Sequence, residues 1–167
     1  MTDEFFMREA LKEAKKAFAK DEVPVGAVLV HENKVIARGH NQVELLQDAT
    51  AHAEMLCLTA GSAYFENWRL TDATLYCTLE PCAMCAGAMF AGRIKRLVWG
   101  APDLRVGANK SWVDLFSAKH PIHEIEVLSG VLQDEAAALM REFFQKKRKL
   151  DGEGSRVIAG IDRSAEE

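Results

Sequence analysis

His52-Ala53-Glu54 and Pro81-Cys82-Ala83-Met84-Cys85 are the two segments that decide how this chain is built. One imidazole and two thiols, those of His52, Cys82 and Cys85, can hold a zinc ion through three protein ligands. Three ligands leave the fourth tetrahedral position open to water, as in catalytic zinc sites, whereas structural sites usually fill all four positions. The pattern therefore predicts an open zinc site with one ion per subunit.

Glu54 lies beside the first of these ligands and is expected to move protons at the open position instead of binding the metal. The pattern H-x-E followed by P-C-x-x-C is the known signature of zinc-dependent deaminases that act on nucleic-acid bases. Residues two apart in an ideal helix point to nearly opposite sides. His52 and Glu54 can therefore converge only if His52 lies at the edge of its helix, and we expect it there.

Both segments are expected to begin helices. Pro81 suits the first helical position, where its missing N–H costs nothing, and Cys82 and Cys85 would then share the first turn. His52 is expected at the start of its own helix. Since the positive end of a helix lowers the pKa of a thiol, two helix N-termini that meet at the metal favour thiolate ligands.

The same residues have simpler interpretations when they are taken one by one. A single H-x-E is usually a surface or core feature, and a single C-x-x-C also occurs in thioredoxin-like redox motifs. Pro81 argues against the redox motif, and the combination of both segments with a preceding strand favours zinc. Cys57 and Cys77 are interpreted as small core residues.

The composition is that of an ordinary globular protein. The chain has 167 residues, 49% apolar and 28% charged, enough for one domain with a real core. No apolar run reaches the roughly 18 residues of a membrane span. The N-terminus Met1-Thr2-Asp3-Glu4 has no basic segment that leads into an apolar one, so no secretory signal is expected.

Charge and cysteine use give two further expectations. Four cysteines, two of them in a C-x-x-C pair, suggest metal or redox use in a reducing compartment, and the expected location is the cytoplasm. The net charge of −4 argues against a protein coated in nucleic acid, but a local basic patch remains compatible with it.

The apolar periodicity predicts helices packed on a sheet of about five strands. Helices are expected over residues 3–20, 51–60 (capped by Thr50 or Asp48), from Pro81 onward, and over 111–118 and 134–149. Strands are expected over 24–31, 34–39, 73–79, 96–100 and 124–128, with a tight hairpin at Glu32-Asn33. A helical crossover between the last two strands would permit a parallel pair and hence a mixed sheet.

One domain is expected over residues 1–150. Residues 151–167 are polar and contain glycine, so we expect a disordered C-terminal tail.

At these residues the chain resembles the bacterial tRNA-specific adenosine deaminases. The resemblance covers about residues 5–149 and includes the blocks VPVGAVLV at 23–30, TAHAE at 50–54, TLEPC at 78–82 and MCAGAM at 84–89. Such long blocks are more specific than the metal motifs alone, which would suit many deaminases. The positions that match outside them include Asn41 and Asp103.

The resemblance implies an α/β protein with a three-layer α/β/α cytidine-deaminase-like fold around a central mixed five-stranded sheet. It also implies a zinc-dependent homodimer that binds a tRNA anticodon stem-loop and converts adenosine to inosine by hydrolytic deamination at the wobble position. By position it implies zinc ligands at His52, Cys82 and Cys85, a proton shuttle at Glu54, and substrate contacts at Asn41, Ala53 and Asp103.

Some positions depart from the family pattern or have another interpretation. Asp48-Ala49-Thr50 stands where the family commonly has Asp-Pro-Thr, and Pro102 and Arg105 flank Asp103 where other residues are usual. Asn41 could be a turn residue, and Asp103 a loop or cap residue. The basic run Lys146, Lys147, Arg148 and Lys149 is a possible RNA contact or a solvated helix end that the helix dipole favours.

Two competing functions share parts of this pattern. A zinc-dependent deaminase of a free nucleobase or nucleoside, of the guanine or cytosine type, would use the same metal site, and the basic C-terminal helix favours RNA over it. A non-enzymatic zinc or RNA-binding module would not need the open coordination position or Glu54.

Overall fold

Five strands form one mixed sheet at the centre of the computed structural model, which describes residues 1–161, with side chains described to residue 152. The strands are β1 (Gly26–His31), β2 (Lys34–His40), β3 (Thr74–Leu79), β4 (Arg96–Ala101) and β5 (Glu126–Ser129), in the order β2-β1-β3-β4-β5. β1 pairs antiparallel with β2 and β3, whereas β3 with β4 and β4 with β5 are parallel. The predicted mixed five-stranded sheet is confirmed.

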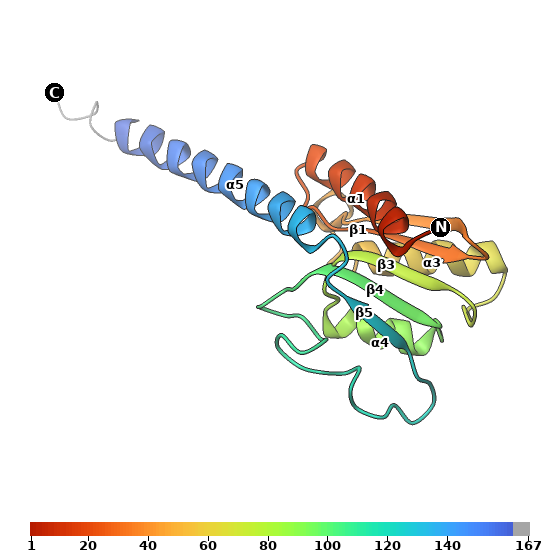
Figure 1. Cartoon of the computed structure of the whole chain (residues 1–167). Helices are drawn as coiled ribbons and strands as arrows, with labels where there is room; N and C mark the ends of the chain where they lie inside the picture. The colour runs from red at the N-terminus through yellow and green to blue at the C-terminus, as the bar shows by residue number, and fades with distance from the viewer. Residues whose placement is uncertain (162–167) are drawn as a thin grey trace.

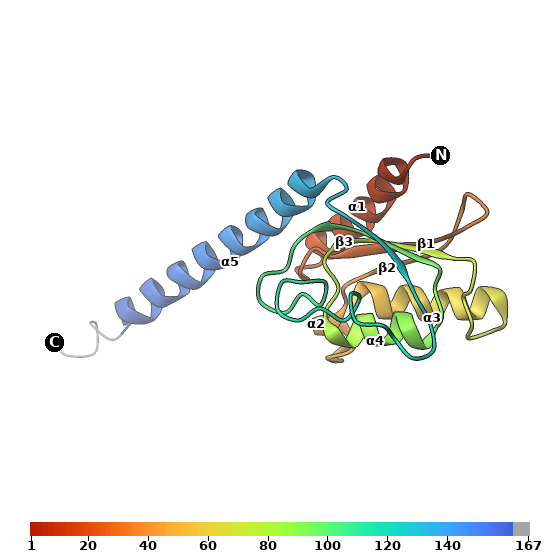
Figure 2. The ribbon, with the colours of Figure 1, turned by 60° about the horizontal axis from the view of Figure 1, so that its bottom comes forward.

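Helices cover both faces of the sheet and give the expected three layers (Figures 1 and 2). They are α1 (Asp3–Ala19), α2 (Val43–Leu46), α3 (Ala53–Phe65), α4 (Ala83–Ala91) and α5 (Gln133–Ile161). α1 and the start of α5 lie on one face, and α3 and α4 lie on the other. No helix of the described part of the chain is long and apolar enough to cross a membrane.

The central strands are apolar at nearly every position because both of their faces are buried. In β1, Ala27 and Leu29 point into the core on the α3 side, while Val28 points into the core on the α1 side. β3 and β4 alternate in the same way. This double burial explains why the strands are continuous apolar runs instead of alternating with polar residues.

The β1–β2 hairpin turns at Glu32 and Asn33, which have φ angles of 48° and 59°. Two consecutive residues in the left-handed region are typical of the tight turn that matches the twist of an antiparallel pair. The hairpin predicted at these two residues is confirmed.

The predicted helix over residues 111–118 is wrong. The structure has no helix between β4 and β5, and the chain there forms only isolated bridges such as Asn109 with Asp114. The amide N–H of Leu115 donates to the carbonyl of Ala108 at 2.9 Å, whereas a helix would require it to donate to the carbonyl of Ser111. The last two strands are nevertheless parallel, joined by a long loop.

Helix α5 continues past its predicted end at residue 149 to Ile161, and Figure 1 shows its last turns projecting away from the sheet. Residues 151–161 are therefore helical in the structure, where a disordered tail was expected, and residues 162–167 lie outside the described residues. Glycine costs a helix interior only about 1 kcal/mol relative to alanine. No proline follows Leu150 to stop the helix sterically.

Candidate metal centre and active site

Three ligand atoms meet where β3 and two helix starts come together. Nδ1 of His52 lies 3.6 Å from Sγ of Cys82 and 3.6 Å from Sγ of Cys85, and the three atoms lie within 4.8 Å of one another. Tetrahedral zinc bonds of about 2.1 Å to nitrogen and about 2.3 Å to sulfur would place such atoms about 3.6 Å apart. Within the described residues this is the one group of three or more potential ligands, so the set fits an open zinc site.

The backbone explains how His52 and Glu54 can serve one site. His52 is the N-cap of α3, with extended φ and ψ of −72° and 151°, and Glu54 lies in the first helical turn. The expected edge position of His52 is confirmed. The caps predicted at Thr50 or Asp48 are wrong, because the helix begins only at Ala53.

The second helix start differs in one detail from the expected geometry. Cys82 is the N-cap of α4, again extended, and Cys85 lies in the first turn, so Pro81 precedes the cap and does not take the first helical position. Cys82 stays extended because it forms an antiparallel bridge with Gly107. The expected convergence of two helix N-termini at the site is present.

The pKa values of the two thiols of the site are shifted in opposite directions. The hydrogen bond from Cys85 lowers the pKa of Cys82 to about 4, with a smaller contribution from His52. The same contact with Cys82 raises the pKa of Cys85, and the hydrogen bond to Cys82 raises the pKa of His52. A thiolate beside a helix N-terminus is the form of cysteine that binds a metal.

Glu54 is almost fully enclosed, with 4% of its surface exposed. Burial raises the pKa of its carboxyl group, while a hydrogen bond with Cys85 and the charge of His52 act in the opposite direction. The side chain lies on the wall of the cavity beside the ligands without joining the ligand group. This is the position expected of a proton carrier at an open metal site.

A cavity of about 1160 Å³ connects the metal site to the C-terminal helix. Its walls include all of the expected substrate contacts: Asn41, Ala53 and Asp103 line it together with His52, Glu54 and Cys82. Asn41 is buried. Its main-chain N–H donates to the main-chain carbonyl of Val25 at 3.0 Å, which fixes the position of this residue directly after β2. The structure thus brings together the site residues that the sequence predicted.

The basic run at residues 146–149 is divided by the helix. Lys147 lines the cavity and pairs with Asp21 at 2.7 Å between Nζ and Oδ2. Lys146 and Lys149 line a separate hollow beside Phe18. Arg148 is exposed. Only one of the four predicted RNA contacts therefore faces the cavity directly.

Several cavity walls were not predicted from the sequence. The short helix α2 contributes Val43, Glu44 and Leu45, and α5 contributes Met140, Phe143 and Phe144. Phe143 both lines the cavity and is buried, with 4% of its surface exposed. No local sequence signal distinguishes an aromatic residue that lines a cavity from one that fills a core.

Comparison with known proteins relates these features to one family. The family model described as the cytidine and deoxycytidylate deaminase zinc-binding region matches residues 1–101. The tRNA-specific adenosine deaminase of Bacillus subtilis is 47% identical over 147 residues, which is 88% of this chain and 91% of the relative. The chloroplastic tRNA(adenine(34)) deaminase of Arabidopsis thaliana is 54% identical over 159 residues, but the chain spans only 12% of that relative's length.

Comparison with solved structures also points to deaminases. One, from a study of A-to-I editing by tRNA:A34 deaminases at the wobble position of transfer RNA, has a TM-score of 0.78 and 45% identity. It aligns over 81% of this chain and 98% of that chain. A guanine deaminase from Nitrosomonas europaea has a TM-score of 0.75 and 26% identity, over 85% of this chain and 84% of that chain.

Proposed function

The chain belongs to the cytidine and deoxycytidylate deaminase family, in its tRNA-specific adenosine deaminase branch, and we propose that it converts adenosine to inosine at the wobble position of a tRNA anticodon. In this hydrolysis water adds its oxygen to the ring carbon that bears the amino group, and ammonia leaves. The observation that carries the proposal is the cavity of about 1160 Å³ that joins the metal site to the basic helix α5. It exceeds the roughly 300–1,000 Å³ of a typical small-molecule site and so suits a strand of several nucleotides.

His52, Cys82 and Cys85 would hold the zinc ion, because their ligand atoms already have the spacing that tetrahedral zinc requires. The chemistry that zinc supplies in such a site is the activation of water at neutral pH.

Glu54 carries the protons in the proposed reaction. Its carboxylate accepts a proton from the attacking water and passes it to the ring nitrogen beside the attacked carbon. It then assists the departure of ammonia, so the protein needs no second general acid. The enclosed position of Glu54 keeps bulk solvent away from these transfers.

The base itself is held by the residues around the mouth of the site. Asn41 and Ala53 line the same cavity as His52 and Glu54, and Asp103, which also lines it, lies on the loop that follows β4. An adenine in a duplex cannot reach this buried site, so the base must be unpaired or flipped. An anticodon loop offers such unstacked bases, and loops are the usual targets of sequence-specific RNA recognition.

Phosphate contacts must come from a local patch, since the net charge of −4 opposes binding to RNA in general. Lys147 lies at the end of the cavity, and Lys146, Arg148 and Lys149 extend the positive charge along the outside of α5. We place the RNA backbone along this part of the helix.

A homodimer and a cytoplasmic location complete the proposal. We propose residues 85–91 of α4 as the region of the dimer contact. Ala86 and Met89 pack inside their own subunit, whereas Gly87 is exposed and has open space around it. The exposed side of α4 at Gly87 is therefore the surface we assign to the partner subunit.

The proposed location in the cytoplasm agrees with the cysteines. All four are free thiols, which suits a reducing compartment.

A comparison of substrates tests this function against its closest competitor. Ammonia release is measured with an anticodon stem-loop RNA that carries a wobble adenosine, and with free adenosine, guanine and cytosine at equal concentrations. We expect turnover of the stem-loop far above that of the free compounds. Faster turnover of guanine than of the stem-loop would assign the chain to the nucleobase deaminases instead.

A further inference from the structure

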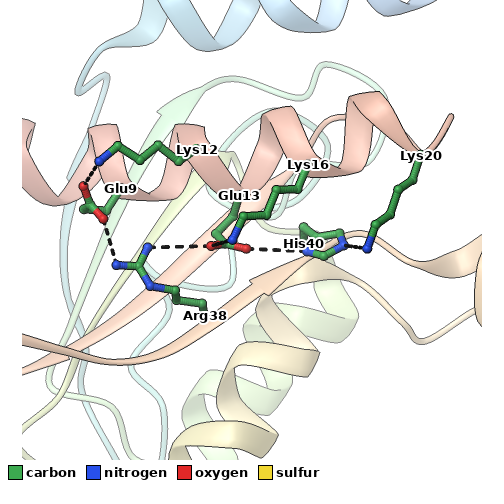
Figure 3. Close-up of polar contacts among 7 residues, drawn as sticks. All are labelled: Glu9, Lys12, Glu13, Lys16, Lys20, Arg38 and His40. Atoms are coloured by element: carbon green, nitrogen blue, oxygen red, sulfur yellow. Dashed lines mark hydrogen bonds and ion pairs between the residues drawn. The ribbon is translucent and has the colours of Figure 1, made fainter.

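Three buried glutamates outside the metal site have different partners for their carboxylate oxygens. Glu13, Glu22 and Glu80 are each no more than 2% exposed. Glu13 is surrounded by cationic and imidazole groups, as Figure 3 shows: its carboxylate lies 2.7 Å from Nζ of Lys16, 3.6 Å from Nη1 of Arg38 and 3.5 Å from Nδ1 of His40. This network ties α1 to β2. Glu13 itself does not line the cavity, whereas Lys20, which lies 3.4 Å from His40 at the end of the network, does.

Glu80, by contrast, is satisfied by the polypeptide of one loop. Oε1 accepts from the amide N–H of Asp103 at 3.2 Å and from the hydroxyl of Ser111. Oε2 accepts from the amide N–H groups of Asn109 at 2.9 Å and Ser111 at 3.3 Å. A carboxylate has about four lone-pair sites, so these four contacts leave it no capacity to bind substrate.

The loop held by Glu80 is also joined to the metal site. Gly107 forms the antiparallel bridge with Cys82, and the amide N–H of Ala108 donates to the carbonyl of Pro81 at 2.8 Å. A Cβ on Gly107 would lie 2.2 Å from Oε2 of Glu80, so only glycine permits this approach. The loop, the carboxylate and the segment that bears the first cysteine ligand are therefore fixed relative to one another.

The side chains that this loop presents form one wall of the cavity. Asp103, Arg105 and Val106 all line it. Oδ1 of Asp103 accepts the amide N–H of Arg105 at 3.1 Å, so the loop turns locally at the point where it meets the cavity. The position of this wall depends on the hydrogen bonds that hold the two ends of the loop. Glu80 accepts hydrogen bonds at both ends, from Asp103 at the start and from Asn109 and Ser111 at the end.

We infer that Glu80 is a positioning residue that holds the loop of residues 103–111 as the substrate-facing wall of the cavity. It acts through Asp103, Arg105 and Val106 and does not itself touch the reacting atoms. This inference deepens the proposed function, on which its kinetic test rests. Another part of the cavity wall is built in a similar way, since Glu22 accepts the amide N–H groups of Glu44 and Leu45 at the start of α2.

The test uses Glu80→Gln in the full-length zinc-loaded protein. The amide group that replaces one oxygen cannot accept from the loop N–H groups, so the loop loses part of its anchorage. Trypsin should then cut after Arg105 and Lys110 at least several-fold faster than in the wild type. The KM for the stem-loop RNA should rise roughly 10-fold, the size expected when a hydrogen bond to a charged group is lost, while kcat stays within about twofold.

Glu13→Gln is the matched control, because it removes an equally buried carboxylate that does not line the cavity and accepts no bond from the loop of residues 103–111. It should lower the unfolding temperature but leave cleavage at Arg105 and Lys110, and KM, unchanged. A KM rise of equal size in both variants would show that the effect is a general loss of stability and would overturn the inference.

Ser111→Ala provides a milder variant if Glu80→Gln does not fold, since it removes only the hydroxyl donor. It should change cleavage and KM in the same direction by a smaller factor. Wild-type cleavage rates in the folded Glu80→Gln protein, or in Ser111→Ala when it alone folds, would overturn the inference. The proteolysis does not depend on RNA turnover, so a wild-type protein inactive on RNA would reject only the proposed function.

Discussion

His52 and Cys82 owe their shared geometry to the same backbone feature. Each is an N-cap with an extended conformation, directly before the helix that carries a second functional residue. The extended cap allows His52 to turn toward the cysteines while Glu54, two residues later, faces the same cavity. A regular helix through His52 would point these two side chains apart.

Replacement of Glu54 by glutamine should separate proton transfer from metal binding. Glutamine keeps the size of the side chain but cannot carry a proton between water and the ring nitrogen. We expect normal zinc content and a decrease in kcat of roughly 10²–10⁴-fold, the usual contribution of general acid–base catalysis. Atomic absorption and single-turnover kinetics check this, and a variant with near wild-type kcat would remove Glu54 from the mechanism.

Cys82→Ala and Cys85→Ala should each lose the metal. Two remaining protein ligands hold zinc much more weakly than three, so the variants should contain far less than one zinc per chain. Because zinc binds the folded state, removal by a chelator should lower the unfolding temperature of the wild type but not that of the variants. Full zinc content in either variant would contradict the ligand assignment.

At the scale of the elements, an ion pair between Asp3 and Arg96 joins the start of α1 to β4. Oδ1 of Asp3 lies 2.6 Å from Nη1 of Arg96, and Oδ2 lies 3.0 Å from Nη2. The hydroxyl of Tyr76 donates to Oδ1 at 2.8 Å. The hydrogen bond from Arg96 holds the pKa of Asp3 below its ordinary value of 3.8.

Asp3 should therefore make stability depend on pH in the acid range. A carboxyl group whose folded pKa is lowered stabilises the protein above its unfolded pKa, and this contribution disappears as the pH falls through the folded pKa. Asp3→Asn should lose about 1 kcal/mol of unfolding free energy at pH 7, because the pair is bidentate but partly exposed. Urea unfolding of the wild type and of Asp3→Asn at pH 7 and near pH 3 checks this. A difference in unfolding free energy between the two proteins that is the same at both pH values would contradict it.

The elements that could be predicted from the sequence are those fixed by local patterns. The alternation of Val28 with Leu29, the turn at Glu32-Asn33 and the ligand spacing at Cys82 and Cys85 each act within a few residues. The loop between β4 and β5 could not be predicted, because its amide N–H groups bond outside a helical pattern: those of Asn109 and Ser111 donate to Glu80, distant in sequence, and that of Leu115 donates to Ala108. The apolar residues of 111–118 resemble a helix only while those bonds are unknown.

The cavity was predictable in its chemistry but not in its extent. His52, Glu54, Asn41 and Asp103 were found through motifs and resemblance. Helix α2 was missed because it is only one turn long and is stabilised by Glu22, which lies in the loop between α1 and β1. An acidic residue is usually exposed, so the sequence gives no sign that this one is buried.

At the scale of the whole molecule, the dimer surface is testable at one residue. A Cβ added at Gly87 would have open space around it, with no neighbouring atom within 4 Å outside the helix's own backbone. Gly87→Arg should therefore leave the subunit folded and zinc-loaded but weaken the dimer. Sedimentation velocity at micromolar concentration should show dimer for the wild type and monomer for the variant; unchanged dimer in the variant would exclude this surface.

The basic part of α5 should determine how RNA binding depends on salt. Neutralisation of Lys146, Lys147, Arg148 and Lys149 to glutamine should weaken binding of the stem-loop. It should also flatten the salt dependence by roughly 0.7 in the logarithmic slope for each lost phosphate contact. Zinc content and kcat at saturating RNA should not change. An unaltered salt slope would mean that the RNA backbone runs elsewhere on the surface.

The position of inosine in the product tests the central claim most directly. Two anticodon stem-loops are incubated with the zinc-loaded protein, one with adenosine at the wobble position and one with that adenosine moved to the neighbouring loop position. Nuclease digestion and mass spectrometry then locate inosine. The wobble adenosine should be converted completely and the displaced one should persist, with no conversion of either by Glu54→Gln. Absence of inosine from the wobble position under these conditions would contradict the assigned function.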